Sequence, residues 1–189
     1  MGSNVILIGF MGCGKSSIGV RLSYRLRRTV TDTDKMIERQ ARMTVSEIFE
    51  RLGEEAFRQM ETRCLEQLIE EGQEQILSTG GGLPLRERNR ELLKELGTVI
   101  YLRVTAQTVC MRLASDTTRP LLQGDDPEEK VDRLLRERSG IYESAADLIV
   151  DVDDRDFEAI LDEIVEKLDR TKAPDRTERL EKDNEAAGN

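Results

Sequence analysis

One short segment near the amino terminus constrains this chain more than any other. Residues 9–16 read Gly-Phe-Met-Gly-Cys-Gly-Lys-Ser and satisfy the pattern G-x-x-x-x-G-K-[ST]. The segment follows an apolar run from Val5 to Ile8 and precedes a helical stretch from Lys15 to Leu26, so it predicts a loop between a buried strand and a helix. Glycines let such a loop turn tightly and direct several backbone N–H groups at phosphate oxygens. We therefore expect these residues, called the phosphate loop below, to bind a nucleoside triphosphate.

The pattern assigns roles to individual residues of the phosphate loop. Lys15 should reach the β and γ phosphates, and the Ser16 hydroxyl should ligate Mg²⁺. The remaining candidate ATP-binding residues of this region are Gly12, Cys13, Gly14 and Ser17. A glycine-rich turn with an exposed lysine is the alternative, which the flanking strand and helix disfavour. The loop alone does not separate kinases from GTPases and motor ATPases, although the Asn-Lys-x-Asp base-reading motif of GTPases does not occur in the sequence.

Composition restricts the remaining choices. A chain of 189 residues with 38% hydrophobic content suits one domain, which we place at residues 1–170, and a charged tail at 171–189 that we expect to be disordered. The net charge of −9 argues against nucleic acid and anionic membranes as partners, and no run approaches the roughly 20 apolar residues of a membrane span. We expect a cytoplasmic monomer with reduced cysteines. The chain has no histidine, so a general base must be a carboxylate, a lysine, a tyrosine or water.

Short apolar runs alternate with amphipathic stretches, which predicts an α/β fold with three αβα layers around a central parallel sheet. Strands are expected at 5–8, 75–78, 99–102 and 148–150, with a short further strand ending near residue 32. Helices are expected at 15–26, 35–42, 45–52, 54–71, 86–96, 106–113, 127–142 and 157–168. Residues 112–126 form a polar connection that we interpret as a mobile lid.

An aspartate at the end of an apolar run is typical of the magnesium-binding strand of many phosphate-loop proteins. The run Leu148 to Asp151 has this form. Because it lies just before the final helical stretch, we favour the interpretation that it is simply the last strand.

Two carboxylates follow the short second strand. In extended backbone, residues two apart point the same way, so Asp32 and Asp34 can face one site. One carboxylate could hold Mg²⁺ or its water while the other accepts a proton from an attacking hydroxyl. The alternative is that Asp34 only caps the helix that begins near Lys35.

Three further groups are candidates for a second substrate. Arg58 and Glu61 are spaced to share one helix face, although such a pair is often only a surface ion pair. The triple-glycine segment Gly80–Gly82 follows a strand and could leave backbone N–H groups open to a ligand, the alternative being a plain loop. Arg119 in the lid could stabilise charge on a transferring phosphoryl group, or could be an ordinary exposed arginine.

Taken together, these motifs resemble the shikimate kinase family. The likeness covers residues 4 to 168 and rests on the phosphate loop together with Asp32-Thr33-Asp34, Phe57-Arg58 with Glu61, Gly80-Gly81-Gly82, Arg119-Pro120-Leu121-Leu122, and Arg138 before Tyr142. The resemblance implies transfer of the γ-phosphoryl group of ATP to the 3-hydroxyl of shikimate, in the pathway to chorismate and aromatic amino acids. It also implies Mg²⁺ as cofactor. A related small-metabolite kinase such as gluconate kinase, or a silent ATP-binding module, remains an alternative.

The resemblance also assigns roles to residues. On the donor side, Lys15 and Ser16 would bind phosphate and Mg²⁺, Asp32 would assist the metal, Arg112 would lie near the adenine, and Arg119 would close over the phosphates.

On the acceptor side, the substrate-binding region is placed at about residues 33–61 by the resemblance. Asp34 would orient and deprotonate the shikimate hydroxyl. The groups that would hold the substrate carboxylate and hydroxyls are Arg58, Arg138, Gly80, Gly81 and Gly82, and those that would shape the pocket are Phe49, Phe57 and Glu61.

Overall fold

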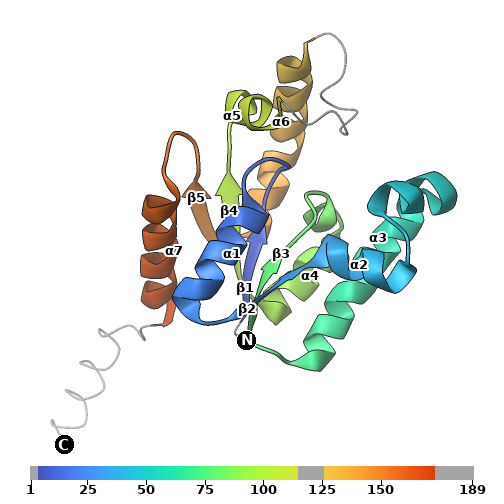
Figure 1. Ribbon diagram of the computed structural model, residues 1–189, viewed down its shortest axis with the longest axis horizontal. Coiled ribbons are helices and arrows are strands. Elements are labelled where there is room, and N and C mark those ends of the chain that lie inside the picture. Colours follow the sequence, from blue (N-terminus) through green and yellow to red (C-terminus); the bar gives the residue numbers. More distant parts are fainter. Residues whose placement is uncertain (1–3, 115–125, 173–189) are drawn as a thin grey trace, which may run out of the picture.

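The fold is built on a parallel sheet of five strands in the order β2-β3-β1-β4-β5 (Figure 1). The computed structural model describes residues 4–114 and 126–172. The strands are β1 (Asn4–Ile8), β2 (Thr29–Asp32), β3 (Gln75–Ser78), β4 (Gly97–Arg103) and β5 (Leu148–Asp151). Neighbouring strands pair in parallel register, with Ile6 opposite both Leu77 and Val99. This arrangement confirms the expected parallel sheet.

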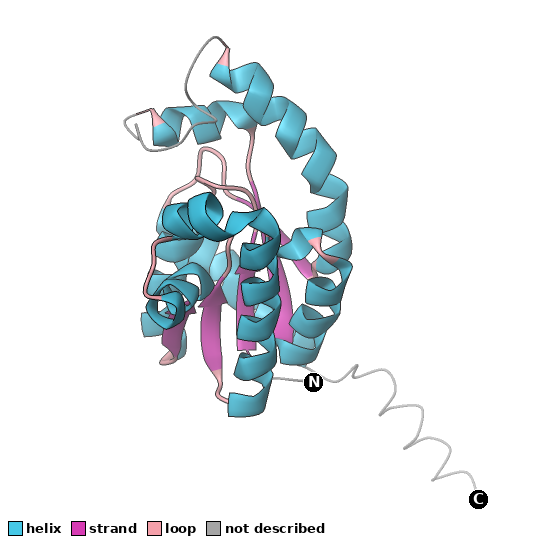
Figure 2. Cartoon of the chain, turned by 90° about the vertical axis from the view of Figure 1, so that its right-hand side faces the viewer, coloured by secondary structure: helices cyan, strands magenta, loops and turns pink. Residues whose placement is uncertain are grey.

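Helices cover both faces of the sheet, which gives the three αβα layers that the sequence predicts (Figure 2). One layer contains α1 (Lys15–Leu26) and α7 (Phe157–Lys172), which contact each other. The other contains α3 (Val45–Glu71), α4 (Glu87–Leu96) and α6 (Pro127–Ala145). The remaining helices are α2 (Thr33–Ala41), α5 (Ala106–Leu113) and the short 3-10 helix η1 (Leu83–Leu85).

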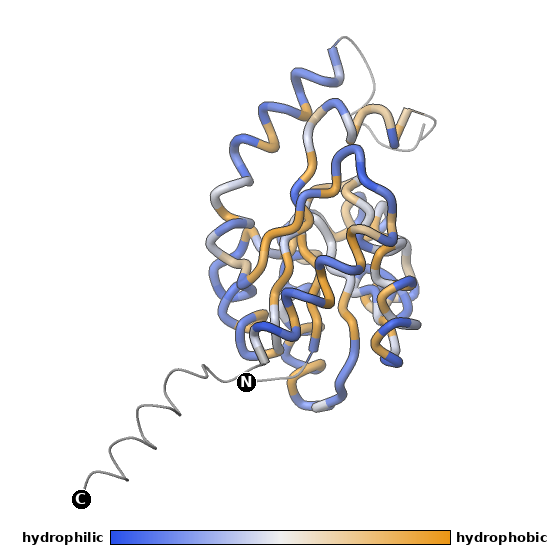
Figure 3. Tube along the Cα trace, turned by 90° about the vertical axis from the view of Figure 1, so that its left-hand side faces the viewer, coloured by the Kyte–Doolittle hydropathy of each residue, from blue (hydrophilic) through white to orange (hydrophobic). Residues whose placement is uncertain are grey.

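The core lies in and beside the central strands. Every residue of β1 and β3 is buried, and Ile6, Leu77 and Ile100 have no exposed surface. Strands that are covered on both faces read as nearly continuous apolar runs, and Figure 3 shows hydrophobic segments concentrated inside the helical layers. This core holds the carboxyl ends of β1, β2 and β3 at one edge of the sheet, where the candidate site is built.

Several element boundaries agree with the sequence and a few differ. Helix α3 is interrupted at Gly53, whose φ of 84° and ψ of 168° are not helical, so it contains the two expected helices. Helix α6 begins at Pro127 after the capping residue Asp126, as predicted, but runs three residues beyond its expected end. Helix α7 extends to Lys172, so the first two residues of the predicted tail are helical.

The late aspartate behaves as a structural residue. Asp151 ends the edge strand β5, and its Oδ1 accepts from Arg103 Nε on the neighbouring strand at 2.6 Å. The interpretation of this run as the last strand is therefore confirmed.

Some predictions fall outside the part of the chain that the structure describes. They are Arg119, most of the lid and residues 173–189 of the tail. Within the described residues, no helix combines the length and apolarity needed to cross a membrane.

Candidate active site

The phosphate loop lies between β1 and α1, with its glycines in conformations that side chains rarely adopt. Gly9, Gly12 and Gly14 have φ values of 142°, 74° and 98°. At Gly9 space is limiting as well, because a Cβ there would lie 2.7 Å from the carbonyl oxygen of Leu102. Helix α1 begins directly at Lys15, so the positive end of its dipole and its free N–H groups face the loop. The local structure is therefore an anion-binding loop.

Two cations bind the backbone of this loop. Lys15 Nζ donates to the carbonyl oxygens of Gly9 and Phe10, both at 2.9 Å. Arg112, on α5, donates from Nη1 to the carbonyl oxygens of Gly12 and Cys13 at 3.3 Å, and from Nη2 to that of Val152 at 2.7 Å. Arg112 thus connects the loop to the segment that follows β5.

A cavity of about 510 Å³ opens over the phosphate loop. Its lining brings together the loop, Asp32, Asp34, residues 78–81 and Arg112. Val152, Arg155 and Phe157, which the sequence analysis did not identify, also line it. Their only sequence signal is that they follow the last strand, at the edge of a parallel sheet where ligands bind.

A cluster of oxygen atoms marks the candidate metal position. Ser16 Oγ donates to Asp32 Oδ2 at 3.3 Å and lies 3.4 Å from Ser78 Oγ at the end of β3. Hydroxyl and carboxylate oxygens are the ligands that Mg²⁺ prefers, and the ion usually completes its shell with water and substrate phosphates. The residues present therefore fit Mg²⁺ bound together with a nucleotide. Among the described residues, no group of three or more His, Cys, Asp or Glu side chains could form a metal site by itself.

Asp32 has a second task. Its Oδ1 accepts hydrogen bonds from the backbone N–H groups of Asp34 at 3.1 Å and Lys35 at 3.2 Å, so it is the N-cap of α2. The capping role that the sequence analysis considered for Asp34 thus belongs to Asp32.

Asp34 lies in the first turn of α2 with its carboxylate in the cavity. A Cβ added at Gly80 would lie 2.5 Å from Asp34 Oδ1, an atom that is buried and has no hydrogen-bond partner among the described residues. Burial raises the pKa of Asp34 to about 6, with a further increase from Asp32 and an opposing effect of Lys15. A carboxylate with such a pKa is ionised at neutral pH and can still accept a proton.

Arg58 and Glu61 are more than a surface pair. Arg58 Nη1 donates to Glu61 Oε2 at 2.9 Å, and Nη2 donates to Glu54 Oε1 at 3.0 Å. Glu61 has no exposed surface, and burial raises its pKa to about 7 against the opposing effect of Arg58. Phe57 packs against Phe49 with ring centroids 4.9 Å apart. The guanidinium group of Arg58 is therefore held in one orientation by two carboxylates.

The triple-glycine segment lies against both groups. A Cβ at Gly82 would overlap the Arg58 guanidinium, just as one at Gly80 would crowd Asp34. The N–H of Gly80 is already bound, because it donates to Thr33 Oγ1 at 3.3 Å. At Gly80 and Gly82 a glycine is needed because the side chains of Asp34 and Arg58 occupy the space that a Cβ would fill.

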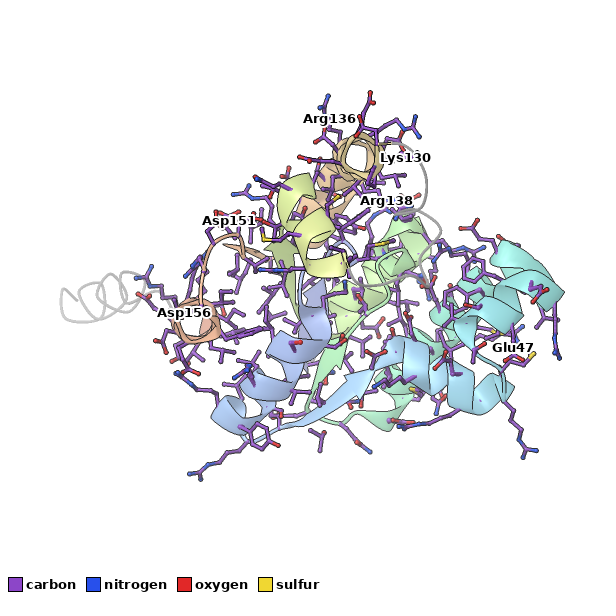
Figure 4. All side chains as sticks on the ribbon, turned by 45° about the horizontal axis from the view of Figure 1, so that its top comes forward. Glu47, Lys130, Arg136, Arg138, Asp151 and Asp156 are labelled. Atoms are coloured by element: carbon purple, nitrogen blue, oxygen red, sulfur yellow. The ribbon has the colours of Figure 1, made fainter. Side chains whose placement is uncertain are left out.

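Helix α6 contributes the last predicted side chain. The guanidinium carbon of Arg138 lies 5.7 Å from the ring centroid of Phe10 in the phosphate loop. Figure 4 shows Arg138 on the side of α6 that faces the body of the molecule, whereas Arg136 lies on the outer side. One helical turn later, the Tyr142 hydroxyl donates to the Gly81 carbonyl oxygen at 2.7 Å. The sequence analysis assigned no role to Tyr142 or Ser78.

Comparison with known proteins agrees with this geometry. The family model described as shikimate kinase matches residues 11–169. The shikimate kinase of Thioalkalivibrio sulfidiphilus is 43% identical over 162 residues, which cover 86% of this chain and 85% of the relative. That of Dictyoglomus turgidum is 40% identical over 171 residues, covering 89% and 98%.

Solved structures give the same result. The shikimate kinase from Acinetobacter baumannii, determined in complex with shikimate, superimposes with a TM-score of 0.83 at 34% identity, covering 92% of this chain and 97% of that one. A gluconokinase from Sinorhizobium meliloti reaches a TM-score of 0.54 at 16% identity, covering 89% and 93%, so it shares the fold alone. By its sequence, its fold and the residues gathered at its cavity, this chain belongs to the shikimate kinase family.

Proposed function

We propose that the chain transfers the γ-phosphoryl group of ATP to the 3-hydroxyl of shikimate, giving shikimate 3-phosphate and ADP. The observation that carries the proposal is the position of Asp34, whose carboxylate lines the same cavity as the phosphate loop. On its other side, the triple-glycine segment joins Asp34 to the guanidinium of Arg58. ATP bound at the phosphate loop and shikimate bound at Arg58 can therefore both reach the carboxylate of Asp34.

The donor side is assigned to the phosphate loop. The backbone N–H groups and the α1 dipole bind the phosphates, and Lys15, now bonded to loop carbonyls, reaches the β and γ phosphates. Ser16 and Asp32 hold Mg²⁺, with Ser78 beside them. When bound, Mg²⁺ neutralises charge on the phosphate oxygens. Arg112, fixed to the loop and to Val152, forms one wall of the nucleotide site.

Asp34 orients the acceptor. It accepts a hydrogen bond from the shikimate hydroxyl and takes the proton as the new O–P bond forms and the bond to ADP breaks. Phosphoryl transfer needs positioning and charge neutralisation more than a strong base, so a carboxylate with a pKa of about 6 is sufficient. The absence of histidine from the chain does not hinder this chemistry.

Arginines recognise the substrate carboxylate. A planar guanidinium can donate two parallel hydrogen bonds to a carboxylate, which suits a small carboxylic acid. Arg58 is held by Glu54 and Glu61, and Arg138 lies over Phe10. Both arginines lie near enough to the Tyr142 hydroxyl to lower its pKa against the larger effect of burial. Phe49 and Phe57 pack beside Arg58 and shape the pocket.

The lid completes the proposal. Arg119 would bind the transferring phosphoryl group and close over the cavity, which would exclude water and limit hydrolysis of ATP. Both it and most of the lid lie outside the described residues.

The test is ADP release by the purified full-length chain with ATP, Mg²⁺ and either shikimate or gluconate. We expect ADP release that depends on shikimate and is at least a hundredfold slower with gluconate. The arginines and the triple-glycine segment fit the rigid ring of shikimate, and hydrogen bonds that gluconate leaves unmade cost a factor on the order of a hundred or more. Asp34→Asn is the matched control, which should bind ATP and lose most turnover. No ADP above the shikimate-free background, or a preference for gluconate, would refute the proposal.

A further inference from the structure

Tyr142 connects α6 to the triple-glycine segment, far away in the sequence. Its hydroxyl donates to the carbonyl oxygen of Gly81 at 2.7 Å. We propose that Tyr142 is a positioning residue for the acceptor, because this hydrogen bond holds the triple-glycine segment against the phosphate loop in the orientation that binds shikimate. The inference rests on the proposed function, in which that segment contacts the substrate.

The tyrosine itself is immobilised at both ends. Its side chain has no exposed surface, and its ring lies 5.1 Å from the ring of Tyr101 on β4, centroid to centroid. Buried phenols are usually hydrogen-bonded at their polar tip, and for Tyr142 the Gly81 carbonyl is the partner. The ring is thus anchored to the sheet while the hydroxyl holds the loop.

Gly81 lies between Tyr142 and the phosphate loop. A Cβ added at Gly81 would make ordinary van der Waals contact with the phosphate loop, 3.4 Å from the Gly9 carbonyl oxygen and 3.5 Å from the Met11 nitrogen, so the gap between the two loops admits one methyl group. The peptide that Tyr142 holds therefore lies beside the loop assigned to the donor. Small displacements matter here, because transfer requires the reacting atoms to lie close together and in line.

The same hydrogen bond directs the backbone N–H of Gly82. A peptide unit is planar and trans, so a Gly81 carbonyl that points at Tyr142 turns the N–H of Gly82 the opposite way. Within the described part of the chain, the N–H groups of Gly81 and Gly82 meet no acceptor, whereas that of Gly80 is bound by Thr33. The Gly82 N–H belongs to the peptide that Tyr142 holds, so it is available to shikimate oxygens as long as that peptide keeps its orientation.

The hydroxyl remains a donor over the working range of pH. Burial raises the pKa of Tyr142 to about 12, and Arg138 opposes this increase. Loss of the bond by ionisation is therefore not expected.

The experiment compares Tyr142→Phe with Tyr101→Phe. Each removes one hydroxyl from the same pair of tilted rings, and the Tyr101 hydroxyl makes no hydrogen bond to the described residues. For Tyr142→Phe we expect the KM for shikimate to rise on the order of tenfold, as for loss of one buried hydrogen bond, with the KM for ATP within about twofold. Tyr101→Phe should leave both KM values within about twofold. An unchanged KM for shikimate, or an equal rise for both substrates, overturns the inference.

Backbone amide exchange provides a readout that needs no substrate. The N–H of Leu83 donates to Gly80 and that of Leu85 donates to Gly82, so their exchange reports how firmly the segment is held. Tyr142→Phe should accelerate exchange at both amides on the order of tenfold, and Tyr101→Phe should not. Equal exchange in the wild type and in Tyr142→Phe refutes the positioning role. Because this measurement is independent of turnover, it still decides the inference if the chain does not phosphorylate shikimate.

Discussion

Replacing Asp34 by asparagine should make the folded chain more stable at pH 8 while it removes most of the turnover. Asp34 is largely buried, its Oδ1 has no partner among the described residues, and burial raises its pKa to about 6 from the usual 3.8. An ionised carboxylate in this position destabilises the fold, and the amide has the same shape without the charge.

The magnitude follows from proton linkage. Each tenfold change in proton affinity corresponds to about 1.4 kcal/mol, so a pKa of about 6 against 3.8 in the unfolded chain costs about 3 kcal/mol once Asp34 is ionised. Its partial exposure reduces this cost, and we expect Asp34→Asn to gain about 1–3 kcal/mol at pH 8. Since the folded state keeps the proton to higher pH than the unfolded state, wild-type stability falls as pH rises from about 4 to 6.

The assay is urea unfolding of both proteins at pH 5 and pH 8. The gain from Asp34→Asn should be about half as large at pH 5, where the folded wild type is mostly protonated at Asp34. Asp156→Asn is the control: Asp156 accepts from Ala159 N at the exposed start of α7, and asparagine caps equally well, so the change should stay below about 0.5 kcal/mol. A loss of stability in Asp34→Asn at pH 8, or a gain that does not increase with pH, would contradict the reasoning.

Three further predictions concern the same site and its supporting helix. The kcat/KM for shikimate should fall as pH drops below about 6, because Asp34 becomes protonated, while titration still detects ATP binding; a flat profile down to pH 5 would exclude Asp34 as the acceptor of the proton. Gly82→Ala should raise the KM for shikimate on the order of tenfold or more, because its Cβ would overlap the Arg58 guanidinium, and steady-state kinetics at saturating ATP would measure it. Gly140→Ala, in α6 with open space around it, should instead raise the melting temperature by about 2 °C in calorimetry and leave the KM unchanged; a lower melting temperature would show that the glycine is needed.

Local signals predicted the framework of the site well. The bounds of α1 and α5 agree with expectation, and the break in α3 falls at Gly53, because apolar periods, caps and glycines act over a few residues. The phosphate loop is equally local: its glycines and Lys15 are adjacent in the sequence, so their pattern alone indicates their joint function.

Contacts between distant segments explain what the sequence did not show. The spacing of Arg58 and Glu61 fits a surface pair and a buried one equally well, and only the packing of α3 decides that Glu61 is fully buried. Positions 80 and 82 require glycine because side chains from α2 and α3 lie against them, and no local sequence pattern reveals this contact. In the sequence, Tyr142 looks like an ordinary core residue of a helix. Its hydrogen-bond partner is Gly81, on the loop after β3, and this distant contact leaves no local signal.

A crystal structure with ADP, Mg²⁺ and shikimate bound tests the central claim most directly. We expect the 3-hydroxyl oxygen within about 2.6–3.2 Å of an Asp34 carboxylate oxygen, and the shikimate carboxylate paired with Arg58 and Arg138. The ADP phosphates should lie in the phosphate loop, on the opposite side of Asp34 from the arginines. Shikimate bound with its carboxylate away from both arginines, or with no hydroxyl at Asp34, would contradict the account.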